Sequence, residues 1–91
     1  MLEIYPSSRF KRSFKKIPAC IKKDFIIQVE IFKNDSFNFQ LKTHKLKGKL
    51  SNHYSFYLQS GFRVLFNFIK NNKILLINIG SHDDYKKWRK N

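Results

Sequence analysis

The spacing of apolar side chains divides the chain into a helical first part and a strand-rich second part. In residues 7–34 they recur every three to four positions, which is the period of an amphipathic helix. Phe10, Phe14 and Ile17 share one face of a first helix, with basic side chains between them. Pro18 ends that helix and suits the first turn of a second one.

The second helix is predicted to end at the Asn34-Asp35 pair. Its apolar face is formed by Ile21, Phe25, Val29 and Phe32, broadened by Ile26, Ile27 and Ile31. The isoleucine content makes a strand over 25–32 the competing interpretation. The length of the apolar run and its Pro-Ala-Cys beginning favour a helix, in which Cys20 is expected to be a small core residue.

Short apolar runs bounded by turn residues predict strands elsewhere. The predicted strands are residues 2–5, 53–58, 62–69 and 74–79. Ser60-Gly61 and the polar segment 70–73 form the turns between the last three. Residues 37–44 are ambiguous, and residues 83–90 are expected to form one or two helical turns.

These elements predict an α+β fold in which two N-terminal helices pack on a small antiparallel sheet, in the order β-α-α-β-β-β. The 91 residues correspond to a single domain, spanning 1–91. A core of this size is thin, and ten Phe residues are expected to compensate for that. No apolar run approaches the ~20 residues that span a bilayer, and we expect a cytoplasmic protein without membrane contact.

The net charge of the chain limits the classes of partner that we expect it to bind. Lys and Arg number 19 against 6 Asp and Glu, which gives a formal net charge of +13. Such an excess indicates a polyanion or an acidic protein as partner. The single cysteine excludes an intramolecular disulfide, and no Cys/His set has zinc spacing, so neither metal nor small-molecule cofactor is expected.

Three short motifs follow one another in the second part of the chain. They are His44-Lys45-Leu46-Lys47-Gly48, Gly61-Phe62-Arg63 and Gly80-Ser81-His82 with Tyr85. In this order, after two basic helices, they resemble the RelE/ParE superfamily of bacterial toxins from type II toxin–antitoxin modules. The resemblance implies the β-α-α-β-β-β fold and an acidic cognate antitoxin as partner. RelE-like and YafQ-like members act on the ribosome and its mRNA, whereas ParE-like members inhibit DNA gyrase and lack nuclease residues.

Metal-free RNA cleavage needs a base for the ribose 2′-OH, cations for the phosphorane and an acid for the 5′-oxygen. The resemblance implies that Arg63 stabilises the phosphate, since a guanidinium can bind two of its oxygens. His82 and His44 are candidate acid or base, because imidazole titrates near neutrality. Tyr85 is a candidate for stacking on a base or for a phosphate contact.

Each of these residues also has a purely structural interpretation. Arg63 can simply begin a strand at the surface, and His82 can begin a helix whose next residues are acidic. His44 can be a loop residue held by the backbone. Tyr85 can anchor the C-terminal turn.

The basic loop adds Lys45, Lys47 and Lys49 as candidate RNA contacts, with solvated surface charges as the alternative. One departure from the family concerns the strand before Arg63, where the RelE branch carries two lysines. Ser55 and Tyr57 stand there instead, so a nuclease would depend on the two histidines and the arginine.

Three functions are compatible with these features of the sequence. The leading hypothesis is a ribosome-dependent, metal-independent mRNA endoribonuclease that inhibits translation. The alternatives are a ParE-like gyrase inhibitor and a non-catalytic RNA-binding module. The leading hypothesis requires Arg63 and His82 to converge in one positively charged hollow.

Overall fold

The structure, a computed structural model, describes residues 2–47 and 52–90. Lys49 and Gly48 of the predicted basic loop therefore lie outside the described residues. The helices are α1 Ser8–Lys16, α2 Ala19–Asn34, the short 3-10 helix η1 Phe39–Leu41, and α3 His82–Lys90. The strands are β1 Glu3–Pro6, β2 His44–Lys45, β3 Tyr54–Tyr57, β4 Arg63–Lys70 and β5 Lys73–Gly80. None of the described helices is both long and apolar enough to cross a membrane.

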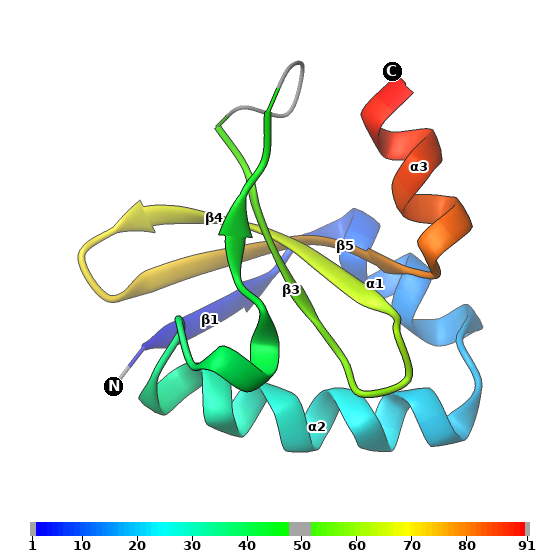
Figure 1. The fold of residues 1–91 in the computed structure, drawn as a ribbon, viewed down its shortest axis with the longest axis horizontal. Helices are drawn as coiled ribbons and strands as arrows, with labels where there is room; N and C mark the ends of the chain where they lie inside the picture. Colours follow the sequence, from blue (N-terminus) through cyan, green and yellow to red (C-terminus); the bar gives the residue numbers. More distant parts are fainter. Residues whose placement is uncertain (1, 48–51, 91) are drawn as a thin grey trace.

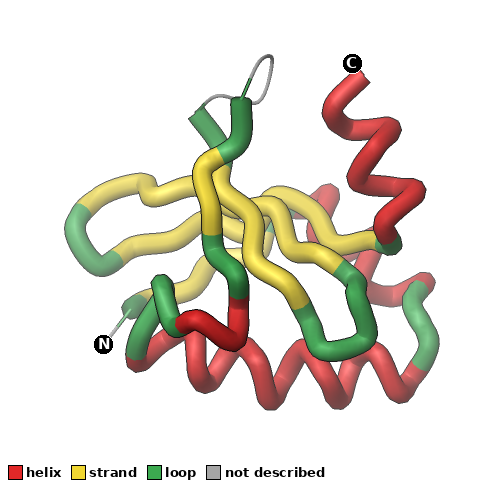
Figure 2. The backbone as a smooth tube through the Cα atoms, viewed as in Figure 1, coloured by secondary structure: helices red, strands yellow, loops and turns green. Residues whose placement is uncertain are grey.

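The strands form one twisted sheet in the order β1-β5-β4-β3-β2. Helix α2 runs beneath the sheet, and α3 stands at its other side (Figures 1 and 2). The predicted two-layer α+β fold is confirmed. The sheet is mixed rather than purely antiparallel, because β1 pairs in parallel with β5 from Glu3↔Lys73 to Pro6↔Leu76. Two helices and three strands separate β1 from β5, so no hairpin forces them to run in opposite directions.

Helix α1 begins directly after Ser7, which is its N-cap residue. The Ser7 side chain accepts a hydrogen bond from the Phe10 backbone at 3.0 Å and caps the helix. The Ser7 hydroxyl also donates to the Ile77 carbonyl at 3.1 Å, which joins the helix start to β5. On the buried face, Phe10 and Phe14 pack against Phe25 of α2.

Residues 25–32 are helical, as predicted. Ile21, Val29 and Phe32 are buried in α2, whereas Ile26 and Ile27 are each 59% exposed. The prediction for Cys20 was wrong, because this residue is exposed. It precedes Ile21, the first buried residue of the helix, and so lies outside the buried stripe.

Alternation along β3 and β4 separates two faces of the sheet. On the face toward α1 and α2, the Phe32 ring lies 4.6 Å from Phe56 and 4.9 Å from Phe66, between centroids. On the opposite face, Leu46, Leu65 and Tyr85 form a second, smaller cluster. The second face carries most of the candidate residues.

Helix α3 is longer than the one or two turns expected and begins one residue earlier, at His82. Ser81 and Asp84 form a reciprocal cap. The Asp84 carboxylate accepts from the Ser81 backbone at 3.0 Å, and the Ser81 hydroxyl accepts from the Asp84 backbone at 3.2 Å. The absence of a side chain at Gly80 lets α3 approach the end of β5 closely.

Candidate active site

Arg63 is the first residue of β4, opposite Tyr57 on β3 and Gly80 on β5. The turn that leads into it is fixed from below by α2. The Asp24 carboxylate accepts hydrogen bonds from the backbone of Gln59 at 3.2 Å and of Ser60 at 2.9 Å. The backbone of Arg63 is therefore held by two neighbouring strands and an anchored turn.

The Arg63 guanidinium lies between two aromatic rings. Its Cζ is 4.5 Å from the Tyr57 ring centroid and 4.3 Å from the Tyr85 ring centroid. Both distances are well inside the ~6 Å range of cation–π attraction. The side chain is half-buried, and its Nε atom is buried without a hydrogen-bond partner.

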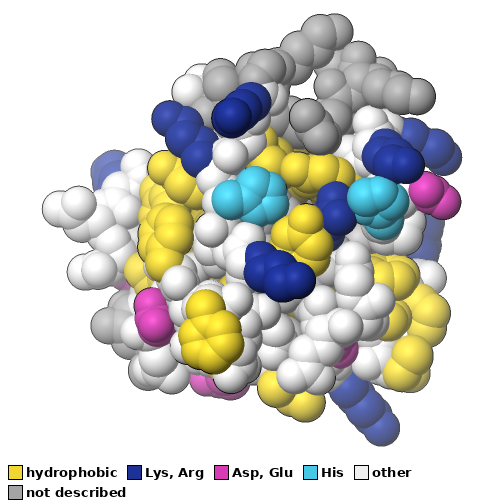
Figure 3. All heavy atoms as spheres, viewed as in Figure 1, with side chains coloured by type: hydrophobic (Ala, Val, Ile, Leu, Met, Phe, Trp, Pro, Cys, Tyr) yellow, Lys and Arg dark blue, Asp and Glu magenta, His cyan; other side chains and the backbone are white. Residues whose placement is uncertain are grey.

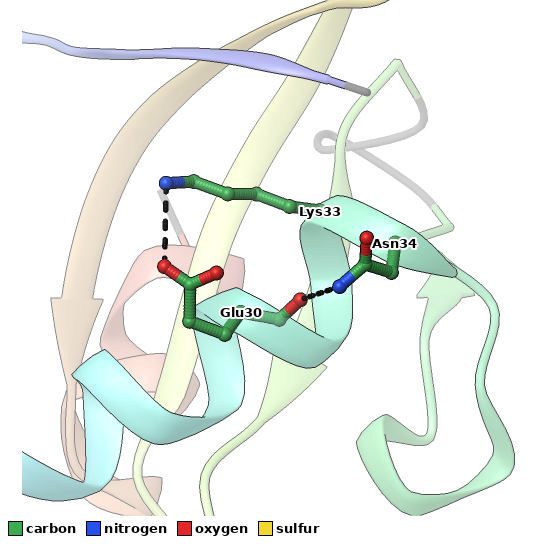
Figure 4. A network of polar contacts seen from close by, with 3 residues as sticks. All are labelled: Glu30, Lys33 and Asn34. Carbon is green, nitrogen blue, oxygen red and sulfur yellow. Dashed lines mark hydrogen bonds and ion pairs between the residues drawn. The ribbon is translucent and has the colours of Figure 1, made fainter.

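No carboxylate neutralises this guanidinium in the described part of the chain. The sole ion pair among residues 2–47 and 52–90 joins Lys33 Nζ to Glu30 Oε1 at 3.6 Å on α2. Figure 4 shows that pair, with the Asn34 amide donating to the Glu30 carbonyl at 3.0 Å. The Arg63 charge is thus available to a bound anion.

The imidazole of His44 lies beside Tyr57, with ring centroids 6.0 Å apart. Its Nδ1 is 2.9 Å from the Lys42 carbonyl oxygen. A carbonyl can only accept, so we assign the proton of the neutral ring to Nδ1, which leaves Nε2 with a lone pair. Lys42 has a left-handed backbone with φ 50 at the end of η1, and its own Nζ lies 5.8 Å from the Tyr57 centroid.

A small hollow of about 160 Å³ opens beside these groups. It is lined by His44, Lys45, Leu46, Lys47 and Tyr85. The structure thus brings four predicted site residues to one place, and Tyr85 also contacts Arg63. The two lysines are exposed, which is what contacts with a phosphate backbone require.

His82 begins α3 and is exposed. It follows closely after Gly80, which pairs with Arg63, so both predicted residues belong to the same end of the β4–β5 pair. Within the described residues, His82 has no hydrogen bond, ion pair or ring contact that links it to the Arg63 cluster. Figure 3 shows two histidine side chains on one face, with hydrophobic and Lys or Arg side chains between them.

The sequence alone did not assign a role to Tyr57 or Lys42 here. Tyr57 could have been found by counting outward from the Ser60-Gly61 turn, which places it opposite Arg63. The role of Lys42 depends on a left-handed backbone that its residue type does not indicate. No group of three or more His, Cys, Asp or Glu that could hold a metal ion occurs in the described segments.

No protein-family model matches the sequence, and no curated protein matches it. Solved structures do match over nearly the whole chain. A conserved hypothetical protein from Helicobacter pylori is 19% identical with a TM-score of 0.71, covering 91% of this chain and 97% of that one. A chain of the RelB-RelE antitoxin-toxin complex from Methanococcus jannaschii is 19% identical with a TM-score of 0.71, covering 92% and 96%.

YafQ from Escherichia coli is 11% identical with a TM-score of 0.68, covering 93% of this chain and 98% of YafQ. At these identities the likeness concerns the fold. The chain has the α+β fold of the RelE-like toxins, as the motifs of the sequence predict.

Proposed function

We propose that this protein, with its RelE-like fold, is the toxin of a type II toxin–antitoxin module and cleaves mRNA on the ribosome. The observation that carries the proposal is the Arg63 guanidinium, which has no carboxylate partner among the described residues and lies in one cluster with His44. A cation and a potential base on one surface are what metal-free RNA cleavage needs. We place its action in the cytoplasm, where mRNA is translated.

An acidic antitoxin is the expected partner. Three of the matching structures are antitoxin–toxin complexes: RelB-RelE from Methanococcus jannaschii, and DinJ-YafQ and RelBE from Escherichia coli. The net charge of +13 favours an acidic protein as the counterpart of this chain.

In the proposed reaction, His44 Nε2 takes the proton of a ribose 2′-OH, and the 2′-oxygen attacks the adjacent phosphorus. Arg63 donates hydrogen bonds to the non-bridging oxygens and stabilises their charge in the phosphorane. His82 donates a proton to the 5′-oxygen as its bond to phosphorus breaks. The products are a 2′,3′-cyclic phosphate and a 5′-hydroxyl.

The lysines of the hollow have a different role. Lys45 and Lys47 contact neighbouring phosphates and add an electrostatic term that does not depend on sequence. Lys49 is proposed for the same role by its place in the basic loop.

One observation favours the gyrase-inhibition alternative. Ser55 is fully buried, and the Tyr57 ring stacks on Arg63, so the face of β3 supplies no amine or imidazole base. In that function the same surface would bind a protein without acid–base chemistry.

Inducible expression with mapping of transcript 5′ ends separates the two functions. We expect growth arrest and mRNA cut at codon-defined positions, and no cuts with Arg63→Ala or His44→Ala. Intact mRNA in arrested cells, together with inhibited supercoiling by gyrase, would overturn the nuclease proposal.

A further inference from the structure

We propose that Tyr57 and Tyr85 form an aromatic clamp, which holds the Arg63 guanidinium in one plane and leaves its outer edge free for a phosphate. The inference rests on the proposed function and assigns both tyrosines to positioning of Arg63. It adds Tyr57 to the site, and it gives Tyr85 a role other than stacking on a base.

The Arg63 guanidinium lies close to both tyrosine rings. The guanidinium carbon is 4.5 Å from one ring centroid and 4.3 Å from the other. The two rings come from different elements, β3 and α3, and each lies against the arginine. Aromatic faces attract a planar cation from both sides without using any of its N–H donors.

The choice of aromatic partners has a chemical consequence. A half-buried arginine is commonly balanced by a carboxylate, which would accept its N–H groups and cancel its charge. Within residues 2–47 and 52–90, the Arg63 guanidinium has neither a hydrogen bond nor an ion pair. With Nε buried, the terminal amino groups are the donors left for a ligand.

The fold holds the backbone of Tyr57 and the ring of Tyr85 in place. The Gln28 side chain, fully buried on α2, donates to the Tyr57 carbonyl at 3.4 Å. Tyr85 is 6% exposed and packs with Leu46 and Leu65. A guanidinium that lies against a ring on an anchored strand and against a buried ring is preorganised, which lowers the cost of binding the phosphorane.

Burial also limits what Tyr85 can do. Because one face of its ring lies on Arg63 and little of it is exposed, the ring is not open to a splayed nucleotide base. The clamp therefore replaces the base-stacking role considered from the sequence.

The first test compares Tyr57→Phe with Tyr57→Leu in single-turnover cleavage on ribosomes programmed with a defined mRNA. Tyr57→Phe keeps the ring and should retain most of the wild-type rate. Tyr57→Leu removes the ring at similar bulk and should lower the cleavage rate roughly 10- to 100-fold, with little change in the affinity for the programmed ribosome. Equal rates for Tyr57→Leu and wild type, with Arg63→Ala inactive, would overturn the clamp.

A second readout needs no RNA cleavage. In ¹⁵N-labelled protein, the Nε–H signal of Arg63 should be shifted by the ring currents and should exchange slowly with solvent. Both properties should persist in Tyr57→Phe and weaken in Tyr57→Leu, in which only the Tyr85 ring remains beside the guanidinium. An ordinary, fast-exchanging signal in the wild type would refute the clamp even if the protein cleaves mRNA.

The two readouts also keep the failure of the clamp distinct from the failure of the proposed function. A wild type that cuts no mRNA but shows the protected, ring-shifted signal would overturn the nuclease function and support the clamp as a structural device.

Discussion

A single backbone contact sets the chemical state of His44. The Lys42 carbonyl lies 2.9 Å from Nδ1, and Lys42 reaches that position through its left-handed φ of 50. A hydrogen bond to Nδ1 fixes both the tautomer and the orientation of the ring. In the neutral ring this contact leaves the lone pair on Nε2, the atom that the proposed reaction uses as the base.

Replacement of His44 by Ala should lower the cleavage rate by about 10²- to 10⁴-fold, the usual contribution of a general base. The measurement is single-turnover cleavage at saturating toxin, with thermal unfolding to verify the fold. Lys45→Ala is the matched control, since Lys45 lines the same hollow but should change affinity rather than rate. A His44→Ala variant with the wild-type rate would remove His44 from the mechanism.

At the scale of residues, the sequence indicated candidate site residues better than it indicated the contacts between them. Its motifs pointed to Arg63, His44, Tyr85 and His82. The fold brings the first three into one cluster, but the described hollow is lined by neither Arg63 nor His82, so the predicted convergence of these two residues in one hollow is not shown. The partner ring of Arg63 was missed, because the pairing of Tyr57 with Arg63 follows from strand register rather than from either residue.

Among the helices and strands, α3 affects the candidate site most, because both Tyr85 and His82 lie on it. It approaches β5 at Gly80, where an added Cβ would lie 2.7 Å from Asp84 Cβ and 3.0 Å from the Trp88 ring. The close approach of α3 to β5 thus depends on the absence of a Cβ atom at Gly80.

Gly80→Ala should move α3 outward and destabilise the fold by about 1–3 kcal/mol, the range for overpacking a tight contact. It should also withdraw Tyr85 from Arg63 and lower cleavage. Thermal unfolding and the Arg63 Nε–H signal measure the two effects. Asn72→Gly, in the turn before β5 where φ is 65, is the control that should leave α3 in place. An unperturbed Arg63 signal in Gly80→Ala would contradict the expected shift of α3.

Most elements followed from periodicity and turn residues. The choice of helix for 25–32 was correct, because Val29 and Phe32 face the sheet at helical spacing. The short β2 strand was not predicted, since its two residues become a strand only by pairing with Ser55 and Tyr54 of β3. Tertiary pairing of this kind leaves no local pattern.

On the scale of the whole molecule, three Phe rings contact one another within the main core. Phe32 is completely buried and contacts both Phe56 and Phe66.

Phe32→Ala should therefore lower the free energy of unfolding by about 3–5 kcal/mol, the usual loss for a buried Phe. Chemical denaturation measures it, and Phe39→Ala, at an 83% exposed position, is the control expected to change stability little. A loss below 1 kcal/mol for Phe32→Ala would mean that the core repacks around the cavity.

The positive charge is concentrated on α1 as well as near the site. Arg9, Lys11, Arg12, Lys15 and Lys16 are all exposed, and this helix has no acidic residue in its first turn. Like charges at i,i+4 spacing are unfavourable, and so are the cations near the helix start, although Lys15 and Lys16 in the last turn suit the helix dipole. We propose that a bound polyanion offsets this repulsion.

Arg12→Gln combined with Lys16→Gln should weaken ribosome association and reduce its dependence on salt, since each lost phosphate contact lowers the slope by about 0.7–0.9. Association measured over a range of salt concentrations provides the slope. The cleavage rate at saturating toxin should stay unchanged. A slope identical to that of the wild type would show that α1 does not contact RNA.

The parallel pairing of β1 with β5 joins parts of the chain that are synthesised at different times. Residues 3–6 leave the ribosome well before residues 73–80, the strand with which they pair. The two rings beside Arg63 are also separated along the chain, because Tyr57 lies on β3 and Tyr85 on α3. The β1–β5 pairing and the arrangement around Arg63 therefore form only after residues 57–85 have been synthesised, so a shorter nascent chain lacks both.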